Sequence, residues 1–478
     1  MPGHRDGSSA VRGASYPRMA PLLLLLRRVA LSAALASTLL MPAWPSDNVP
    51  KSAGDLASYV AARDENFGWR EVASGKLGDA DYVEYVLTSQ TWRGIAWKHQ
   101  LFVLRPENMR NDARQGLLFI HGGGWKPEYD RERKEADLPV QALLFAQLAR
   151  KIAAPVGVLR QVPFEPMFNR REDALIAYTF DQYLQTGESD WPLLLPMVKS
   201  TVRAMDAMQR IARERWNVAL DSFTLTGASK RGWTAWLTAA TDRRVTAVVP
   251  MVIDVLNVSA QMDHQRATWG GLSDEIRDYS SLDLPNRFKT ERGAALLSAV
   301  DPFSYRKQLT QSKLIMLGTN DRYWPLDALN LYWSELPEPK RVLYIPNQGH
   351  GLQDIERVMG AVSAAHRYAA SGKPLPSTTW SFAVSPQTLD IQVKTDGPVR
   401  RVLIWSARSD TLDFRDARWS SGECTKKQGS YACSWARSEK GYTAVFAETA
   451  FSDGDGLSFS TSTTICIAGP DTSQTPAC

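Results

Sequence analysis

Short apolar runs alternate with longer helical stretches from about residue 101 onward, and this alternation narrows the possible folds more than any other feature. Residues 116–125 (GLLFIHGGGW) form an apolar run that enters a glycine turn, and residues 154–164 supply the next run. Residues 197–216 then space their apolar side chains at helical intervals. Strands that alternate with helices in this way form parallel sheets with crossover helices. The sequence therefore predicts an α/β fold with a mostly parallel sheet and flanking helices.

The pattern changes after the last α/β segment. Residues 371–379 (SGKPLPSTT) have the composition of a linker. Beyond them, residues 380–409 and 442–451 alternate apolar and polar side chains between glycine and aspartate turns, as in a small β-sandwich. We therefore expect an α/β domain at residues 50–375 and an all-β sandwich domain at residues 376–478.

Residues 1–46 have the features of an export signal. An arginine-bearing start leads into residues 21–45, which are apolar apart from Arg27 and Arg28. Met19 is an alternative start, because the residues before it are polar and atypical of a signal. The competing interpretation is an uncleaved membrane anchor, but the two arginines divide the apolar run below the ~20 residues that a span needs. After cleavage we expect no stable membrane insertion and a periplasmic or secreted protein.

The distribution of charge along the chain excludes nucleic acids as a class of partner. The net charge is +5, and five arginines against one aspartate place +4 of it in residues 1–46. Nucleic-acid binding needs a concentrated basic face that neutralises several phosphates, and no later segment provides one. The expected partner is a small-molecule or peptide substrate, not a nucleic acid, and nothing in the sequence favours a particular oligomeric state.

All four cysteines lie near the C-terminus, at Cys424, Cys433, Cys466 and Cys478. In an oxidising compartment paired cysteines are favoured over free thiols. Four cysteines allow three pairings, and Cys424 and Cys433 flank TKKQGSYA, which has the features of a hairpin turn. We therefore predict the disulfides Cys424–Cys433 and Cys466–Cys478. The cysteines have no histidines near them in the sequence, so we expect no metal site, and we expect no cofactor.

Ser229 has the sequence context of a catalytic nucleophile. It follows an apolar strand in LTGASKRG and precedes a helix, a context in which a sharp turn lifts the hydroxyl above the edge of the sheet. Gly227 provides the small residue that such a turn needs. Arg231 stands two positions after the serine and the next glycine is Gly232, so the usual G-x-S-x-G becomes G-x-S-x-x-G. The alternative is a serine that only caps the helix.

A candidate base and a candidate acid follow Ser229 in the chain. His350 lies in a glycine-flanked loop after a predicted strand, and Asp321, 29 residues earlier, ends the strand before that. The order Ser, Asp, His is that of α/β-hydrolases. An imidazole with an ordinary pKa of ~6.5 can accept the serine proton at neutral pH, and a carboxylate fixes its tautomer. Residues 245–253 (VTAVVPMVI) are a predicted strand, and Asp254, which follows it directly, is the alternative acid.

Backbone N–H groups near the serine are candidates for stabilising a developing oxyanion. They belong to Lys230, which follows Ser229, and to Gly123 or Gly124 in HGGGW. This glycine-rich segment is similar to the oxyanion motif of lipases and esterases. Its alternative role is that of a plain tight turn.

From about residue 59 to residue 470 the sequence resembles the PhoPQ-activated pathogenicity-related protein family of exported α/β-hydrolase-like proteins. The likeness is carried by REDALIAYTF (171–180), WPLLLPMVKSTVRAMDAM (191–208), LTGASKRGWTAWLTAATDRRVTAVVPMVIDVLN (225–257), DPFSYRKQL (301–309) and YWSELPEPKRVLYIPNQGH (332–350). The most specific part is GASKRGW followed by DVLN. The resemblance implies a hydrolase-like catalytic domain with a C-terminal β-domain, and it places the nucleophile on Ser229. The sequence departs from the family pattern after Asp321, where it has NDRYWPLDALNLYW.

The leading functional prediction is hydrolysis of an ester or amide through an acyl-enzyme on Ser229. One alternative is a prolyl-peptidase-like aminopeptidase, because Glu172, with Asp173 or Asp254, could hold a substrate amine. By default, Glu172 is a helix-surface acid or the ion-pair partner of a neighbouring arginine, Arg170 or Arg171. The other alternative is a secreted binding or signalling protein that keeps the fold without turnover. Trp324, in DRYWP near the predicted site, indicates an aromatic substrate pocket.

Overall fold

The computed structural model describes residues 56–110, 112–132, 136, 138–453, 456–470 and 478. The chain divides into two units, Met1–Val49 and Pro50–Cys478, and the structure described below is that of the second unit. The predicted export signal at residues 1–46 lies outside the described residues.

The centre of the fold is a parallel sheet with the order β5-β4-β6-β7-β8-β9. Its strands are β4 (Gln115–Ile120), β5 (Val156–Leu159), β6 (Ser222–Ala228), β7 (Val245–Met251), β8 (Ser312–Gly318) and β9 (Lys340–Ile345). An antiparallel meander extends it beyond β5, formed by β1 (Gly68–Leu77), β2 (Ala80–Trp92) and β3 (Ile95–Pro106). The chain is thus an α/β-hydrolase fold, and the predicted fold class is confirmed.

Helices cover both faces of this sheet because its strands are apolar on both sides. Leu117 and Leu118 are adjacent in β4 and lie in two different hydrophobic cores. One core contains buried side chains of α3 (Glu172–Thr186), α4 (Leu194–Trp216) and α5 (Lys230–Thr241). The other contains those of α2 (Ala142–Ile152) and α10 (Ile355–Ala370). Short helices elsewhere in the α/β region are α1 (Leu56–Ala61), η1 (Pro127–Asp130), η4 (Ala328–Leu331) and η5 (Trp333–Glu335).

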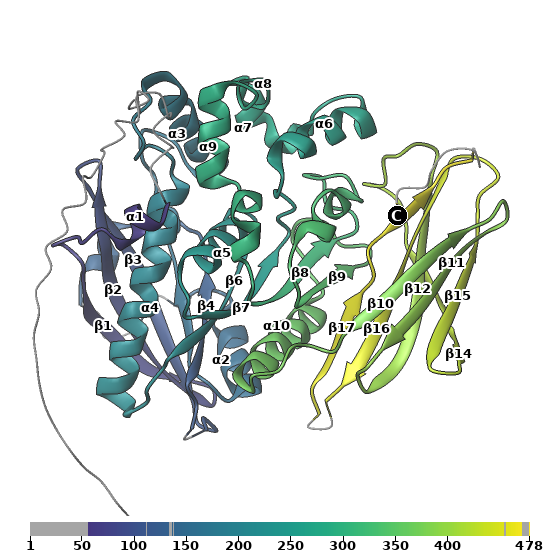
Figure 1. Ribbon diagram of the computed structural model, residues 1–478. Helices are drawn as coiled ribbons and strands as arrows, with labels where there is room; N and C mark the ends of the chain where they lie inside the picture. Colours follow the sequence, from purple (N-terminus) through teal and green to yellow (C-terminus); the bar gives the residue numbers. More distant parts are fainter. Residues whose placement is uncertain (1–55, 111, 133–135, 137, 454–455, 471–477) are drawn as a thin grey trace, which may run out of the picture. The chain divides into compact units, whose positions relative to one another are not determined.

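A helical insertion separates β7 from β8. Its elements are α6 (Val258–Trp269), η2 (Asp274–Ile276), α7 (Arg277–Ser280), α8 (Leu284–Arg287), α9 (Glu291–Val300) and η3 (Pro302–Gln308). Figure 1 shows α6 to α9 grouped at one end of the sheet. The residues that follow β7 lead directly into this insertion.

The C-terminal region is a β-sandwich. One sheet has the order β10-β11-β15-β14, with strands β10 (Thr378–Val384), β11 (Thr388–Thr395), β14 (Thr425–Lys427) and β15 (Ser430–Ala436). The facing strands are β12 (Val399–Ser409), β13 (Ser420–Glu423), β16 (Tyr442–Ser452), β17 (Ser458–Ser462) and β18 (Cys466–Ala468). Buried side chains of both layers, among them Ile391 and Val445, form a shared core.

The facing layer of the sandwich also continues the central sheet. β17 pairs with β9 through Ser462 and Val342, and the Ser462 hydroxyl accepts a hydrogen bond from the Tyr344 N–H (3.1 Å).

In the described part of the chain, disulfides join Cys424 to Cys433 and Cys466 to Cys478, the predicted pairs. Among the described residues, no helix has the length and apolar character to cross a membrane.

Candidate active site

Ser229 lies in a strained turn between β6 and α5. Its φ of 57° and ψ of −132° are unusual for a residue with a side chain. The Ser229 N–H donates to the Met251 carbonyl (2.8 Å), and the Ser229 carbonyl accepts from the Trp233 N–H (3.0 Å). Neighbouring elements therefore hold the strained conformation, and strain that is held in this way is characteristic of functional sites. The turn has the strand-to-helix geometry of a nucleophile elbow.

The structure explains the altered glycine spacing around Ser229. A Cβ on Gly227 would lie 2.8 Å from the Arg231 carbonyl carbon, and a Cβ on Gly232 would lie 2.8 Å from the Gly227 carbonyl oxygen. Both distances are too short for a side chain, so glycine is required at both positions. The motif G-x-S-x-x-G therefore has a glycine at both points where β6 and α5 approach each other closely. Arg231 can stand between the serine and the second glycine without a clash.

His350 and Asp321 are joined by a hydrogen bond. The imidazole Nδ1 lies 2.8 Å from Asp321 Oδ2. The other carboxylate oxygen accepts the Tyr323 N–H (3.0 Å), and the Tyr323 ring stacks on the imidazole with 4.1 Å between ring centroids. His350 Nε2 is buried and has no hydrogen-bond partner among the described residues. The bond at Nδ1 and the stacked Tyr323 ring therefore hold the imidazole in one orientation.

Ser229 and His350 line the same pocket. Trp324 and Lys230, both singled out in the sequence, also line it. The structure therefore brings together the serine, the histidine with its bound aspartate, and the predicted aromatic side chain. Tyr323 lines the pocket as well, although no sequence motif assigns it a role. The only signal for it was its place two residues after Asp321.

The glycine-rich loop starts beside the Ser229 turn, because Ile120 at the end of β4 pairs with Gly227. Gly123 has a φ of 113°, and the Trp125 N–H donates to the Glu165 carbonyl (2.8 Å). Gly123 and Gly124 are not among the described residues that line the pocket, whereas Lys230 is. An oxyanion role for the two glycines stays a prediction.

Glu172 is bound by two cations that follow the serine. Its carboxylate accepts two hydrogen bonds from the Arg231 guanidinium (2.7 and 2.8 Å) and lies 2.9 Å from Lys230 Nζ. Burial opposes ionisation of Glu172, but Arg231 and Lys230 outweigh it and lower the pKa of this carboxyl to about 2. The arginine partner comes from the turn of the nucleophile and not from the sequence neighbours of Glu172. The ion pairs therefore join the start of α3 to the start of α5.

Asp254 has different surroundings from Asp321. It is 4% exposed and accepts a hydrogen bond from the Tyr332 hydroxyl (2.5 Å). Burial raises the pKa of Asp254 to about 7. Asp254 is not among the described residues that line the pocket. The aspartate bonded to His350 is Asp321.

Comparison with known proteins identifies the family. The family model of the PhoPQ-activated pathogenicity-related proteins matches residues 56–415. The chain belongs to this family. The resemblance inferred from the sequence motifs is thereby confirmed.

A curated relative is similar over most of this family member. Autocrine proliferation repressor protein A of Dictyostelium discoideum is 28% identical over 439 residues, which cover 83% of this chain and 85% of the relative. Solved structures with a similar fold include the acetyl xylan esterase from Paenibacillus sp. R4, with a TM-score of 0.47 and 14% identity over 65% of this chain and 92% of that one. The acetyl xylan esterase 1 from Thermoanaerobacterium sp. JW/SL YS485 has a TM-score of 0.44 and 14% identity, over 64% and 90% of the two chains.

The most specific family motifs occupy the centre of the site. GASKRGW forms the Ser229 turn and supplies the two cations that bind Glu172. DVLN, residues 254–257, follows β7 and contains the aspartate bound by Tyr332. Asn257 has a φ of 65° and precedes α6, where the chain turns into the insertion. In this member of the family, the two motifs therefore shape the turn and one wall of the pocket.

Proposed function

We propose that this protein is an exported serine hydrolase that cleaves an ester or an amide through an acyl-enzyme on Ser229. The observation that carries the proposal is the His350–Asp321 hydrogen bond at a pocket that Ser229 also lines. A bound carboxylate holds the imidazole in the tautomer whose Nε2 can accept a proton. Export is supported by the character of residues 1–46 and by the two disulfides.

The reaction would proceed in two half-reactions. His350 Nε2 takes the proton of the Ser229 hydroxyl as Oγ bonds to the substrate carbonyl carbon. The Lys230 N–H would donate a hydrogen bond to the oxyanion that forms. His350 then passes the proton to the leaving group as the carbon–heteroatom bond breaks. Water repeats these steps on the acyl-enzyme and releases the acid and the free serine.

A fluorophosphonate probe on the mature chain tests the proposal. We expect one adduct, on Ser229, and none in Ser229→Ala, as located by mass spectrometry of peptides. Replacement of His350 by Ala should lower the labelling rate by roughly 10²-fold or more, because a general base typically contributes this much.

His264→Ala is the matched control. His264 also bonds to an aspartate, with Nε2 2.7 Å from Asp327 Oδ1, but it is not among the described residues that line the pocket. This variant should label like the unmodified protein. An adduct on another serine, or no adduct under conditions that label a known esterase, would favour the binding or signalling alternative.

A further inference from the structure

The pocket beside Ser229 is walled mainly by apolar side chains. The segment after β7 contributes Val252 and Ile253, and the helical insertion contributes Met262, Phe288 and Leu297. Val252 has a φ of 46° and donates its N–H to the Met316 carbonyl (2.8 Å), so the chain turns at the pocket wall. A wall of this kind favours a ligand group without charge.

The charged side chains of the pocket are already paired with one another. Lys230 Nζ lies 2.8 Å from Asp173 Oδ2 and 2.9 Å from a Glu172 oxygen. The Tyr279 hydroxyl donates to the other Asp173 oxygen (2.9 Å). Both Asp173 oxygens are thus occupied, and the two carboxylates together balance Lys230 and Arg231. A charged substrate group would lose its water here without gaining a free partner of opposite charge among the described lining residues.

The pocket is small. Its volume is about 50 Å³. This is about a third of the ~150 Å³ of a dry apolar cavity that binds benzene, so the space suits an acyl chain of only a few carbons.

We propose, on the basis of the proposed function, that the substrate is an ester or amide whose acyl group is neutral, apolar and short. The pocket takes the acyl group and not the leaving group, because the leaving group must depart before water can attack the acyl-enzyme. Side chains of the insertion form part of the pocket wall, so they hold the acyl group through that step. The paired state of Asp173 and Glu172 disfavours an aminoacyl group.

Substrate series with one changed part test this assignment. On p-nitrophenyl esters, kcat/KM should rise roughly 15-fold from acetate to butyrate, at about fourfold per buried methylene, and should fall again by decanoate. Phenyl butyrate should exceed phenyl 2-aminobutyrate, which adds an ammonium group to the same skeleton, by at least ~100-fold.

Two tryptophan variants on α9 locate the acyl group. Leu297 is half-buried and lines the pocket, whereas Ala294 is exposed on the same helix. Leu297→Trp should lower the butyrate-to-acetate ratio of kcat/KM at least tenfold, and Ala294→Trp should leave this ratio unchanged.

The outcomes separate the two proposals. Failure to hydrolyse any ester contradicts the proposed function. Hydrolysis with no chain-length optimum, with a preference for the aminoacyl ester, or with rates set by the alcohol part overturns the acyl assignment and leaves the hydrolase intact.

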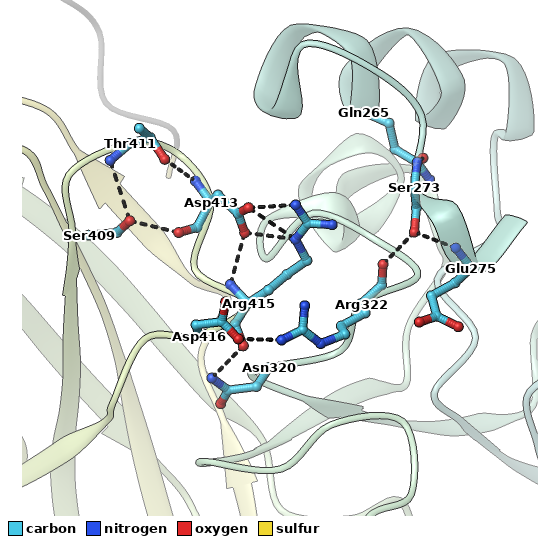
Figure 2. A network of polar contacts seen from close by, with 10 residues as sticks. All are labelled: Gln265, Ser273, Glu275, Asn320, Arg322, Ser409, Thr411, Asp413, Arg415 and Asp416. Carbon is cyan, nitrogen blue, oxygen red and sulfur yellow. Dashed lines mark hydrogen bonds and ion pairs between the residues drawn. The ribbon is translucent and has the colours of Figure 1, made fainter.

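The loop between β12 and β13 contacts the two segments that carry Asp321 and His350. This loop, residues 410–419 of the C-terminal sandwich, contacts the residues on both sides of Asp321 (Figure 2). The Asn320 amide donates to the carbonyls of Ala417 (2.7 Å) and Arg415 (3.2 Å). Arg322 forms an ion pair with an aspartate of the same loop.

The same loop also holds the segment that carries His350. The Asn347 side chain donates to the Trp419 carbonyl (3.0 Å) and accepts the Trp419 N–H (2.8 Å). Asn347 has a φ of 58°, and its N–H donates to the Thr319 hydroxyl (2.9 Å). The loops that carry Asp321 and His350 are therefore hydrogen-bonded to each other and to the sandwich.

The loop is stiffened by contacts of its own. Figure 2 shows the Asp413 carboxylate beside the Arg415 guanidinium, and the shortest of these hydrogen bonds is 2.6 Å. The Arg415 guanidinium lies 4.3 Å from the ring centroid of Trp269 at the end of α6. The loop therefore touches the insertion as well.

We infer that Asn320 and Asn347 are positioning residues through which the C-terminal sandwich fixes Asp321 and His350. A displacement of about 1 Å in a reacting group can lower the rate by ~10². Asn320→Ala and Asn347→Ala should each lower kcat by roughly 10- to 100-fold with little change in KM.

Asn330→Ala is the matched control, since its amide also bridges to the C-terminal region, at the Ile465 carbonyl (3.1 Å), but away from both loops. It should retain kcat. Melting temperatures are compared to ensure that every variant is folded at the assay temperature. If the three variants lose kcat only in proportion to stability, or if Asn320→Ala and Asn347→Ala retain kcat, the positioning role is wrong.

Discussion

At the residue scale, Asp321 and Asp254 both follow strands near Ser229 and have different partners. Asp321 Oδ2 lies 2.8 Å from His350 Nδ1, which needs an acceptor to hold its N–H there. An amide at this position can present an N–H instead and so favour the wrong tautomer. Asp321→Asn should therefore lower kcat by ~10⁴-fold with little change in melting temperature. Steady-state kinetics on an activated ester, with thermal unfolding alongside, checks this.

Asp254→Asn is the matched variant for that experiment. The pKa of Asp254 is raised by burial to about 7, so its neutral form, which an amide resembles, is well populated at neutral pH. The variant should keep most of the turnover. The opposite pattern, with turnover lost here and retained in Asp321→Asn, would transfer the acid role to Asp254.

The raised pKa of Asp254 also predicts how the stability of the Asp254→Asn variant depends on pH. The carboxyl has a pKa near 3.8 when unfolded and about 7 when folded, so the folded protein binds the proton more tightly. The free energy of unfolding therefore falls as pH rises from about 4 to 7, by ~4 kcal/mol at most. Asp254→Asn lacks this loss, and its melting temperature relative to the unmodified protein should rise between pH 5 and pH 8.

At the scale of elements, regular apolar spacing is what the sequence makes visible. The spacing in residues 197–216 predicts a helix, and α4 spans Leu194–Trp216. The run at residues 245–253 predicts a strand, but β7 ends at Met251. The strand stops early because Val252 adopts a positive φ and bonds to the neighbouring strand. This turn is a tertiary effect, so apolar character alone does not reveal it.

The meander β1 to β3 was not predicted, because buried polar pairs interrupt its pattern. Glu84 in β2 and Gln100 in β3 are both buried and bonded to each other (2.8 Å). Gln90 is buried as well and donates to the Pro196 carbonyl in α4 (2.7 Å). Such residues break the alternation by which half-buried strands are recognised. Their partners are defined only once distant segments have come together.

The candidate site, like the fold, could be predicted from the sequence only in part. Ser229, Asp321 and His350 each follow a strand, and the ends of parallel strands meet at one edge of a sheet, so their proximity could be predicted. The partner of Glu172 could not, since Arg231 is 59 residues away along the chain. The contacts of Asn320 and Asn347 with the sandwich are likewise long-range and leave no local pattern.

At the scale of the whole molecule, the sandwich and the central sheet are linked through the β17–β9 pair and the loop at residues 410–419. The described cysteines all lie in the sandwich, where they form two disulfides. The redox state of the compartment therefore acts on the part of the chain that supports the loops of Asp321 and His350.

The Cys424–Cys433 disulfide should contribute measurably to the stability of the folded chain. Closing the nine-residue separation between Cys424 and Cys433 removes chain entropy worth about 2.5 kcal/mol from the unfolded state. Replacing both cysteines by alanine should lower the free energy of unfolding by about that amount, as measured by denaturant titration. Peptide mapping without reductant, on protein purified from the oxidising compartment, should recover Cys424 joined to Cys433 and Cys466 joined to Cys478. Four alkylatable thiols in that material would contradict both the pairing and the predicted destination of the chain.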